Sequence, residues 1–174
     1  MDIVHREADV ALRLGEPTQP DLIARRLVKV GFGLYASDAY LRGAPPLDAL
    51  EDLEAHQLVG LDATGVGFDY AHTFPVQHAL PGTYVYISNS PAAQMAAVRA
   101  GFGIGVLSHR WAALSGDLTR LLPDYNAAEL DLWLVTHEEL RHSARIRATY
   151  DYIAERMLAD ASLFQHGMPA QASG

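Results

Sequence analysis

Three consecutive polar residues, Ser88, Asn89 and Ser90, have the types and spacing best suited in this sequence to bind a small anion. They separate a stretch rich in β-forming residues, 84–88, from an alanine-rich stretch that opens with Pro91. Serine is favoured at a helix N-cap and proline in the first turn. Hydroxyl, amide and backbone N–H groups would then meet at the positive end of a helix dipole, which suits a carboxylate. A helix cap that binds only its own backbone fits the same residues, and both interpretations stay open.

Other polar residues match enzymes in type but not in pattern. Ser108, His109 and Asp117 are the residue types of a nucleophilic triad, yet Ser108 lacks the GxSxG turn that exposes such a serine. His137 and His142 lie five residues apart, which fits neither HExxH nor its inverse. The absence of cysteine excludes thiolate chemistry. We therefore expect no enzyme activity, no metal and no cofactor.

The elements that must position these residues alternate between strands and helices. Strands are expected at 9–14, 28–36, 57–61, 84–88, 104–107, 118–122 and 130–136. Helices are expected at 39–41, 47–53 and 91–100, and after Ser143, which is expected to cap an amphipathic helix. This alternation predicts an α/β architecture with mostly parallel strands. The stretch 84–107 is interpreted as a complete strand–helix–strand unit, with Gly101 ending the helix.

Composition excludes several classes of protein. The 174 residues are 49% hydrophobic and 20% charged, which allows one domain or two small subdomains. A net charge of −8 argues against nucleic-acid binding by this chain. No apolar run is long enough to span a membrane, and the N-terminus does not resemble a signal peptide, so a cytoplasmic location is expected.

Five segments occur in an order that resembles a known family. They are ADVALRLGEP (8–17), ARRLVKVGFGLYASDAYL (24–41), YISNSPAAQMAAVRAGFGIGVLSH (86–109), ELDLWLVTH (129–137) and RIRATYDYIAE (145–155). In these segments the chain resembles the effector-binding (substrate-binding) domain of a LysR-type transcriptional regulator. The resemblance implies an α/β fold like that of type 2 periplasmic binding proteins, with two Rossmann-like subdomains joined by crossing strands.

The resemblance also implies a division of the chain and a cleft. Residues 1–36 and the return segment 108–163 would form the first subdomain, residues 37–107 the second, and residues 164–174 a disordered tail. The cleft-lining positions carried over from the family are Arg13, Gly15, Tyr35, Ser37, Ser88, Asn89 and Ser90. Two of them have structural alternatives. Ser37 also fits a helix N-cap, and Arg13 also fits an ion pair with Asp9 or Glu16.

The implied function is a small-molecule effector-binding and dimerisation module. Its effector would be a carboxylate or an aromatic metabolite, the latter suggested by Tyr35, Phe68, Tyr70 and Phe74. DNA would be bound only through a helix-turn-helix that this sequence does not contain, and the family's first strand, long helix and second strand are also missing, so the fold is expected to be N-terminally truncated. A free-standing solute-binding domain of periplasmic type and an inactive regulator fragment are the alternatives.

Overall fold

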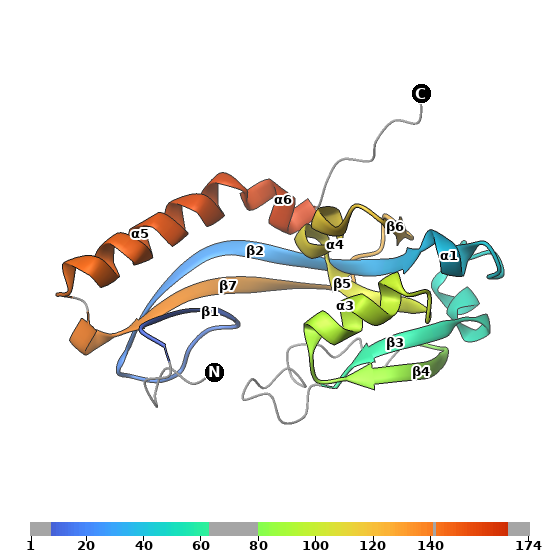
Figure 1. The fold of residues 1–174 in the computed structure, drawn as a ribbon, viewed down its shortest axis with the longest axis horizontal. Coiled ribbons are helices and arrows are strands. Elements are labelled where there is room, and N and C mark those ends of the chain that lie inside the picture. Colours follow the sequence, from blue (N-terminus) through green and yellow to red (C-terminus); the bar gives the residue numbers. More distant parts are fainter. Residues whose placement is uncertain (1–7, 63–79, 141, 167–174) are drawn as a thin grey trace.

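The computed structural model describes residues 8–62, 80–140 and 142–166, which form one seven-stranded mixed sheet with helices packed along it (Figure 1). The strands are β1 (Val10–Leu14), β2 (Leu22–Ser37), β3 (Gln57–Leu61), β4 (Thr83–Ser88), β5 (Ile104–Ser108), β6 (Leu118–Leu121) and β7 (Ala128–His137). The helices are α1 (Asp38–Leu41), α3 (Pro91–Arg99), α4 (His109–Ser115), α5 (Ala144–Ala159) and α6 (Ala161–His166), with 3-10 turns η1 (Leu50–Ala55) and η2 (Glu138–Leu140). No helix within these ranges is both long and apolar enough to cross a membrane.

The long strand β2 joins the two halves of the sheet. The strand order is β1-β7-β2-β5-β3-β4, and β6 also pairs with β2. Between Leu22 and Phe32, β2 pairs with β7, and from Phe32 to Ser37 it pairs with β5 and β6. The expected α/β fold with a crossing strand is confirmed, and the crossing strand is six residues longer at its start than the sequence predicted.

The expectation of mostly parallel strands is wrong. Among the described strands, the only parallel pairs are β3 with β4 and β3 with β5. β2 is antiparallel to β5, β6 and β7, and β1 is antiparallel to β7. The reason is that β2 enters the second half directly, without a crossover helix, so the strands that return beside it run in the opposite direction.

The strand–helix–strand unit predicted around α3 is present. Ser90 is the N-cap of α3, its Oγ accepting a hydrogen bond from the Ala93 N–H at 3.3 Å, and Pro91 begins the helix. Gly101 follows the helix with φ of +85°, a left-handed conformation that glycine adopts without strain. The two strands of the unit, β4 and β5, do not pair with each other but lie on either side of β3.

The C-terminal part differs from the sequence-based expectations at three points. Ser143 occupies the N-cap position of α5, but its side chain makes no capping hydrogen bond. Helix α4 was not predicted, although Ser108 caps it by accepting a hydrogen bond from the Trp111 N–H at 3.3 Å. Helix α6 continues to His166, so residues 164–166 of the expected disordered tail are helical.

The core lies on both halves of β2. Its fully buried side chains include Leu34, Leu53, Leu58, Ile104 and Leu134. Helix α5 runs along β2 in Figure 1 and contributes the buried Ala154 to this cluster. A second cluster, which includes Tyr35, Val98 and Leu107, packs α3 and α4 onto the sheet.

Candidate functional site

The carboxyl ends of strands from both halves of the sheet converge on one region. β1 ends at Leu14, which pairs with Leu132 of β7, and β5 ends at Ser108, which pairs with Phe32 of β2. β3 ends beside Ser88 of β4, directly before α3. Ligands in open α/β sheets bind outside the carboxyl ends of strands, so this region is the expected position of a site.

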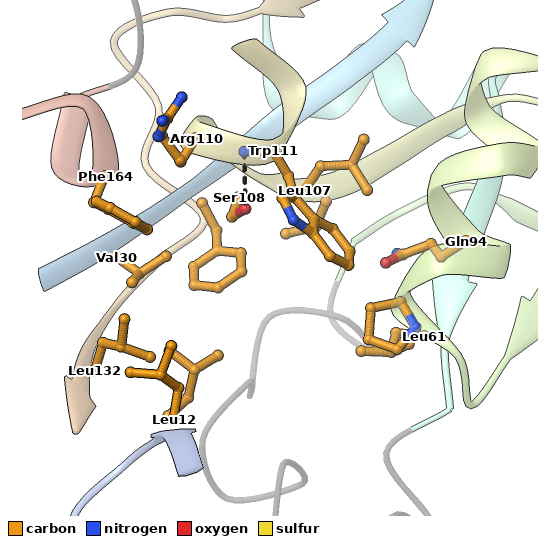
Figure 2. Close-up of a pocket in the computed structure, with 14 residues that line it drawn as sticks. Leu12, Val30, Leu61, Gln94, Leu107, Ser108, Arg110, Trp111, Leu132 and Phe164 are labelled. Atoms are coloured by element: carbon orange, nitrogen blue, oxygen red, sulfur yellow. Dashed lines mark hydrogen bonds between the residues drawn. The ribbon is translucent and has the colours of Figure 1, made fainter. Parts of the chain in front are cut away.

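A cavity of about 360 Å³ lies at this position (Figure 2). One part of its wall comes from the β1–β7–β2 half and from α6: Leu12, Leu14, Val30, Phe32, Leu132 and Phe164. The other part comes from β3, α3, β5 and α4: Leu61, Pro91, Gln94, Val106, Leu107, Ser108, Arg110 and Trp111. Its volume lies within the range of small-molecule pockets, roughly 300–1,000 Å³, and its wall is mainly apolar, as such pockets are.

Four side chains bring polar groups to this wall. Gln94 is only 3% exposed; its Nε2 donates a hydrogen bond to the Val59 carbonyl oxygen at 3.2 Å, and its carboxamide points toward the cavity (Figure 2). Ser108, Arg110 and Trp111 follow one another closely at the end of β5 and the start of α4. A mainly apolar wall with a few placed polar groups can hold and orient an amphipathic ligand.

Arg110 connects this wall to the C-terminal helices. Its Nη2 donates a hydrogen bond to Asp160 Oδ2 at 3.0 Å, and its guanidinium carbon lies 5.8 Å from the centroid of the Phe164 ring. The Arg110 side chain is 23% exposed, and that of Asp160 is 32% exposed. An ion pair this sheltered from solvent is less screened than a surface pair.

Ser88, Asn89 and Ser90 directly precede Pro91, which lines the cavity, but do not line it themselves. Both hydroxyls accept local hydrogen bonds: Ser88 Oγ from the Ser90 N–H at 3.1 Å, and Ser90 Oγ from the Ala93 N–H. Asn89 is exposed. The structure therefore contains the capping arrangement that the sequence left open, directly before a residue that lines the cavity.

Arg13 and Gly15 flank the cavity wall without lining it. Leu12 and Leu14 line the cavity, and neighbouring residues of a strand point to opposite faces. Arg13 Nη1 donates a hydrogen bond to Gln19 Oε1 at 3.1 Å. Asp9, one of the expected partners of Arg13, forms an ion pair with Arg145, with 3.8 Å between Oδ2 and Nη2. Gly15 ends β1 with φ of +82°, and its N–H donates to the carbonyl oxygen of Asp131 at 3.0 Å.

Tyr35 and Ser37 lie away from the cavity, because β2 runs antiparallel to β5. Ser37 is the N-cap of α1 and lies near Gly101, at the opposite end of α3 from Ser90. Tyr35 is 6% exposed, and its hydroxyl forms a 2.8 Å hydrogen bond with Nδ1 of His109. The structure thus gives both residues packing and capping contacts and does not bring them together with Ser88.

The buried histidine of this contact, His109, links three segments. Its Nε2 lies 3.0 Å from Asn126 Oδ1, so a neutral imidazole that donates from Nε2 and accepts the Tyr35 O–H at Nδ1 satisfies both bonds. Burial lowers the pKa of His109, against an opposing effect of the Asn126 hydrogen bond, and burial raises the pKa of the Tyr35 hydroxyl. Asp117 is instead bound to Arg99, with oxygen–nitrogen distances of 2.7 and 3.0 Å. Ser108, His109 and Asp117 are therefore not arranged as a nucleophilic triad.

Residues 2–158 match the family model of the LysR substrate binding domain. The chain belongs to this family. Among curated relatives, the LysR-type domain described here is 29% identical over 166 residues to the "Probable HTH-type transcriptional regulator LtrA" of Klebsiella pneumoniae, covering 91% of this chain and 54% of that protein. It is 30% identical over 161 residues to the "Uncharacterized HTH-type transcriptional regulator YhjC" of Escherichia coli, covering 88% and 54%. The chain thus spans about half the length of these relatives.

Solved structures of LysR regulators share the fold. The regulatory domain of CrgA from Neisseria meningitidis superposes with a TM-score of 0.74 at 23% identity, covering 89% of this chain and 78% of that chain. The effector domain of AmpR from Pseudomonas aeruginosa superposes with a TM-score of 0.67 at 17% identity, covering 92% and 78%. The expected fold of LysR effector domains is confirmed by these likenesses.

Sequence reasoning missed Gln94, Arg110 and Trp111 as cavity residues. A signal was available for two of them, because Arg110 and Trp111 lie within four residues of the end of a predicted buried strand, where ligand contacts concentrate in α/β sheets. For Gln94 the signal was a polar side chain on the buried side of α3, but burial of that side could be known only from the packing of α3 on β3 and β5.

Proposed function

We propose that this LysR substrate-binding domain binds a small-molecule effector in the cavity between the two halves of its sheet. The observation that carries the proposal is that both halves supply the wall, at the carboxyl ends of β1, β3 and β5. A ligand held there contacts both halves at once. It can therefore stabilise one arrangement of the halves over another, which is the requirement for a ligand-driven change.

In this proposal the two subdomains expected from the sequence, residues 1–36 with 108–163 and residues 37–107, move relative to one another, and β2 passes between them. Ser108, Arg110 and Trp111 lie at the start of the return segment and line the same part of the wall as β3 and α3. Effector binding shifts the equilibrium between two arrangements of the subdomains. The size of the shift is limited by the ratio of the effector's affinities for the two arrangements. The chain performs no covalent chemistry in this proposal.

The regulatory outcome belongs to a longer protein. The relatives named above are helix-turn-helix transcriptional regulators, and this chain matches about half of their length. We place DNA binding in a helix-turn-helix outside residues 1–174, because the net charge of −8 disfavours DNA binding by this domain. The regulator in this proposal is a cytoplasmic homo-oligomer. The purified chain is expected to give no salt-sensitive shift of duplex DNA in an electrophoretic mobility assay.

The seven site residues expected from the sequence contribute in different ways in this proposal. Ser88, Asn89 and Ser90 shape the entrance beside Pro91, and Arg13 and Gly15 fix the end of β1 so that Leu12 and Leu14 face the cavity. Tyr35 is hydrogen-bonded to His109, and Ser37 caps α1, so both residues stabilise the fold around the site. Their substitution is expected to alter stability more than ligand affinity.

Blocking the cavity tests the proposal. Leu12, 39% exposed, lines the cavity from β1, and Val85, 45% exposed, lies on β4 and does not line it. Leu12→Trp should abolish the rise in unfolding midpoint that a bound ligand produces, whereas Val85→Trp should keep it. The screen uses small carboxylic acids and their neutral amides with the 174-residue chain. A compound that raises the midpoint of Leu12→Trp as much as that of the original chain would refute the assignment of the cavity.

A further inference from the structure

Arg110 is the only charged side chain among the described residues that line the cavity. It lies in a wall that is otherwise made mostly of leucine, valine and phenylalanine, and Figure 2 shows Arg110 on the Phe164 side of the cavity, across from Gln94, with its guanidinium directed toward the outer edge of the wall. A single cation in an apolar wall favours a ligand with one anionic end and an apolar body, because a charge in such surroundings gains most from a charged partner.

The N-terminus of α3, the other feature suited to an anion, has few donors left. Pro91 has no N–H, the Ala93 N–H donates to Ser90 Oγ, and the Gln94 N–H donates to the Ser90 carbonyl oxygen. Only the N–H of Ala92 in this first turn has no partner among the described residues. A helix N-terminus binds anions through free N–H groups, so capping leaves Arg110 as the stronger anion partner.

Arg110 has capacity for such a partner. A guanidinium carries five N–H donors in a planar fork, and the structure of the described residues gives Arg110 one hydrogen bond, from Nη2 to Asp160. The Asp160 carboxylate is bound to the same guanidinium that would bind a ligand carboxylate. Two carboxylates on one guanidinium repel each other, so a bound anion weakens the Arg110–Asp160 pair.

We propose that Arg110 selects an apolar monocarboxylate as the effector by exchanging its partner, Asp160, for the ligand's carboxylate. This inference rests on the proposed function, since it requires a ligand in the cavity. Asp160 is the C-cap of α5, and its carbonyl oxygen accepts the N–H groups of Leu163 and Phe164 in α6. The exchange therefore removes a contact that stabilises the junction between α5 and α6. Ligand binding thereby increases the mobility of the C-terminal helices.

The test compares two acids with their neutral amides. Octanoate and 3-phenylpropanoate, with octanamide and 3-phenylpropanamide, are titrated calorimetrically into the 174-residue chain at pH 7.5. Hydrogen bonds to charged groups contribute roughly 1.5–3 kcal/mol, so each acid should bind at least about tenfold more tightly than its amide. Arg110→Gln should remove this preference, and Asp160→Asn should tighten acid binding severalfold, because it removes the competing anion.

The matched controls are Arg99→Gln and Asp117→Asn. These residues form an ion pair of the same kind, with Arg99 also on a helix, but they do not line the cavity. Both controls should keep the preference of the original chain for acid over amide. Hydrogen exchange of residues 161–166 should speed up on addition of octanoate to the original chain and stay unchanged in Arg110→Gln.

The outcomes separate this inference from the proposed function. Equal affinity of acid and amide in the original chain, or weaker acid binding by Asp160→Asn, overturns the role of Arg110 while leaving the cavity as the binding site. Acid binding that Leu12→Trp does not reduce overturns the cavity itself. No binding of either acid at millimolar concentration overturns the assigned class of ligand.

Discussion

The substitution Gly33→Ala is expected to destabilise the fold, because the added methyl group would clash with the side chain of His109. A Cβ on Gly33 would lie 2.8 Å from Cε1 of the imidazole and 3.4 Å from Nε of Arg120. The ring cannot easily move, because both of its nitrogens are hydrogen-bonded, to Tyr35 and to Asn126. Overpacking of this kind costs about 1–3 kcal/mol, and the better backbone entropy of alanine returns roughly 0.5–1 kcal/mol, so the expected net loss is about 0–2.5 kcal/mol.

A double-mutant cycle isolates that contact. Free energies of unfolding are measured by urea denaturation for Gly33→Ala, His109→Ala and the double variant. In the His109→Ala background the added methyl group has room, so Gly33→Ala should be neutral or stabilising, and the coupling between the two sites should be at least about 1 kcal/mol. Gly43→Ala is the control, since nothing lies within 4 Å of its Cβ. Gly33→Ala with the same effect in both backgrounds would show that His109 is not the obstacle.

Three further outcomes are expected from the same structure. Because burial lowers the pKa of His109 below the value of about 6.5 that an unfolded chain gives it, the unfolded state binds more protons between these two pKa values, so stability should fall as pH drops below about 6.5. Equilibrium unfolding of the original chain and of His109→Gln from pH 5 to 8 checks this, and parallel curves would contradict it. Ser90→Ala should cost about 1 kcal/mol through loss of the α3 cap, and Ser90→Asp should restore most of it in the same assay. The Arg99–Asp117 pair, with both side chains about half exposed, should contribute under about 1 kcal/mol in a double-mutant cycle, and a much larger coupling would contradict its exposed position.

The sequence predicted the elements of the fold better than their connections. Strand β7 and helix α3 carried clear local signals, namely apolar β-forming residues and a Ser-Pro start with a Gly stop, and both formed close to their expected bounds. The direction of strand pairing had no local signal. It depends on β2 continuing for 16 residues through both halves, and this in turn depends on pairing with β7, which lies about 100 residues later in the chain. The early part of β2 includes the exposed Arg25 and Arg26, and it lacks the apolar run that predicted a strand from Val28.

The sequence could place Ser88 and Ser90 at a strand end but could not predict the wall of the cavity. Ser88 and Ser90 could be placed beside a strand end because a strand–turn–helix signal is local. Ser37 also lies at a strand end, yet at the opposite edge, since β2 is antiparallel to β5. Leu12 and Trp111 line the same cavity from segments far apart in the sequence, and only the order of strands in the sheet brings these segments to one region.

The pairing of β1 with β7 also has a consequence for biosynthesis. Val10 pairs with Thr136, so β1 leaves the ribosome long before β7, its neighbour in the sheet. Until then β2 lacks β7 as well, and its apolar residues stay uncovered. Long-range pairing of this kind slows folding and exposes nascent chains to aggregation. The domain is therefore expected to depend on chaperones during translation, and to fold only after residue 137 has cleared the exit tunnel.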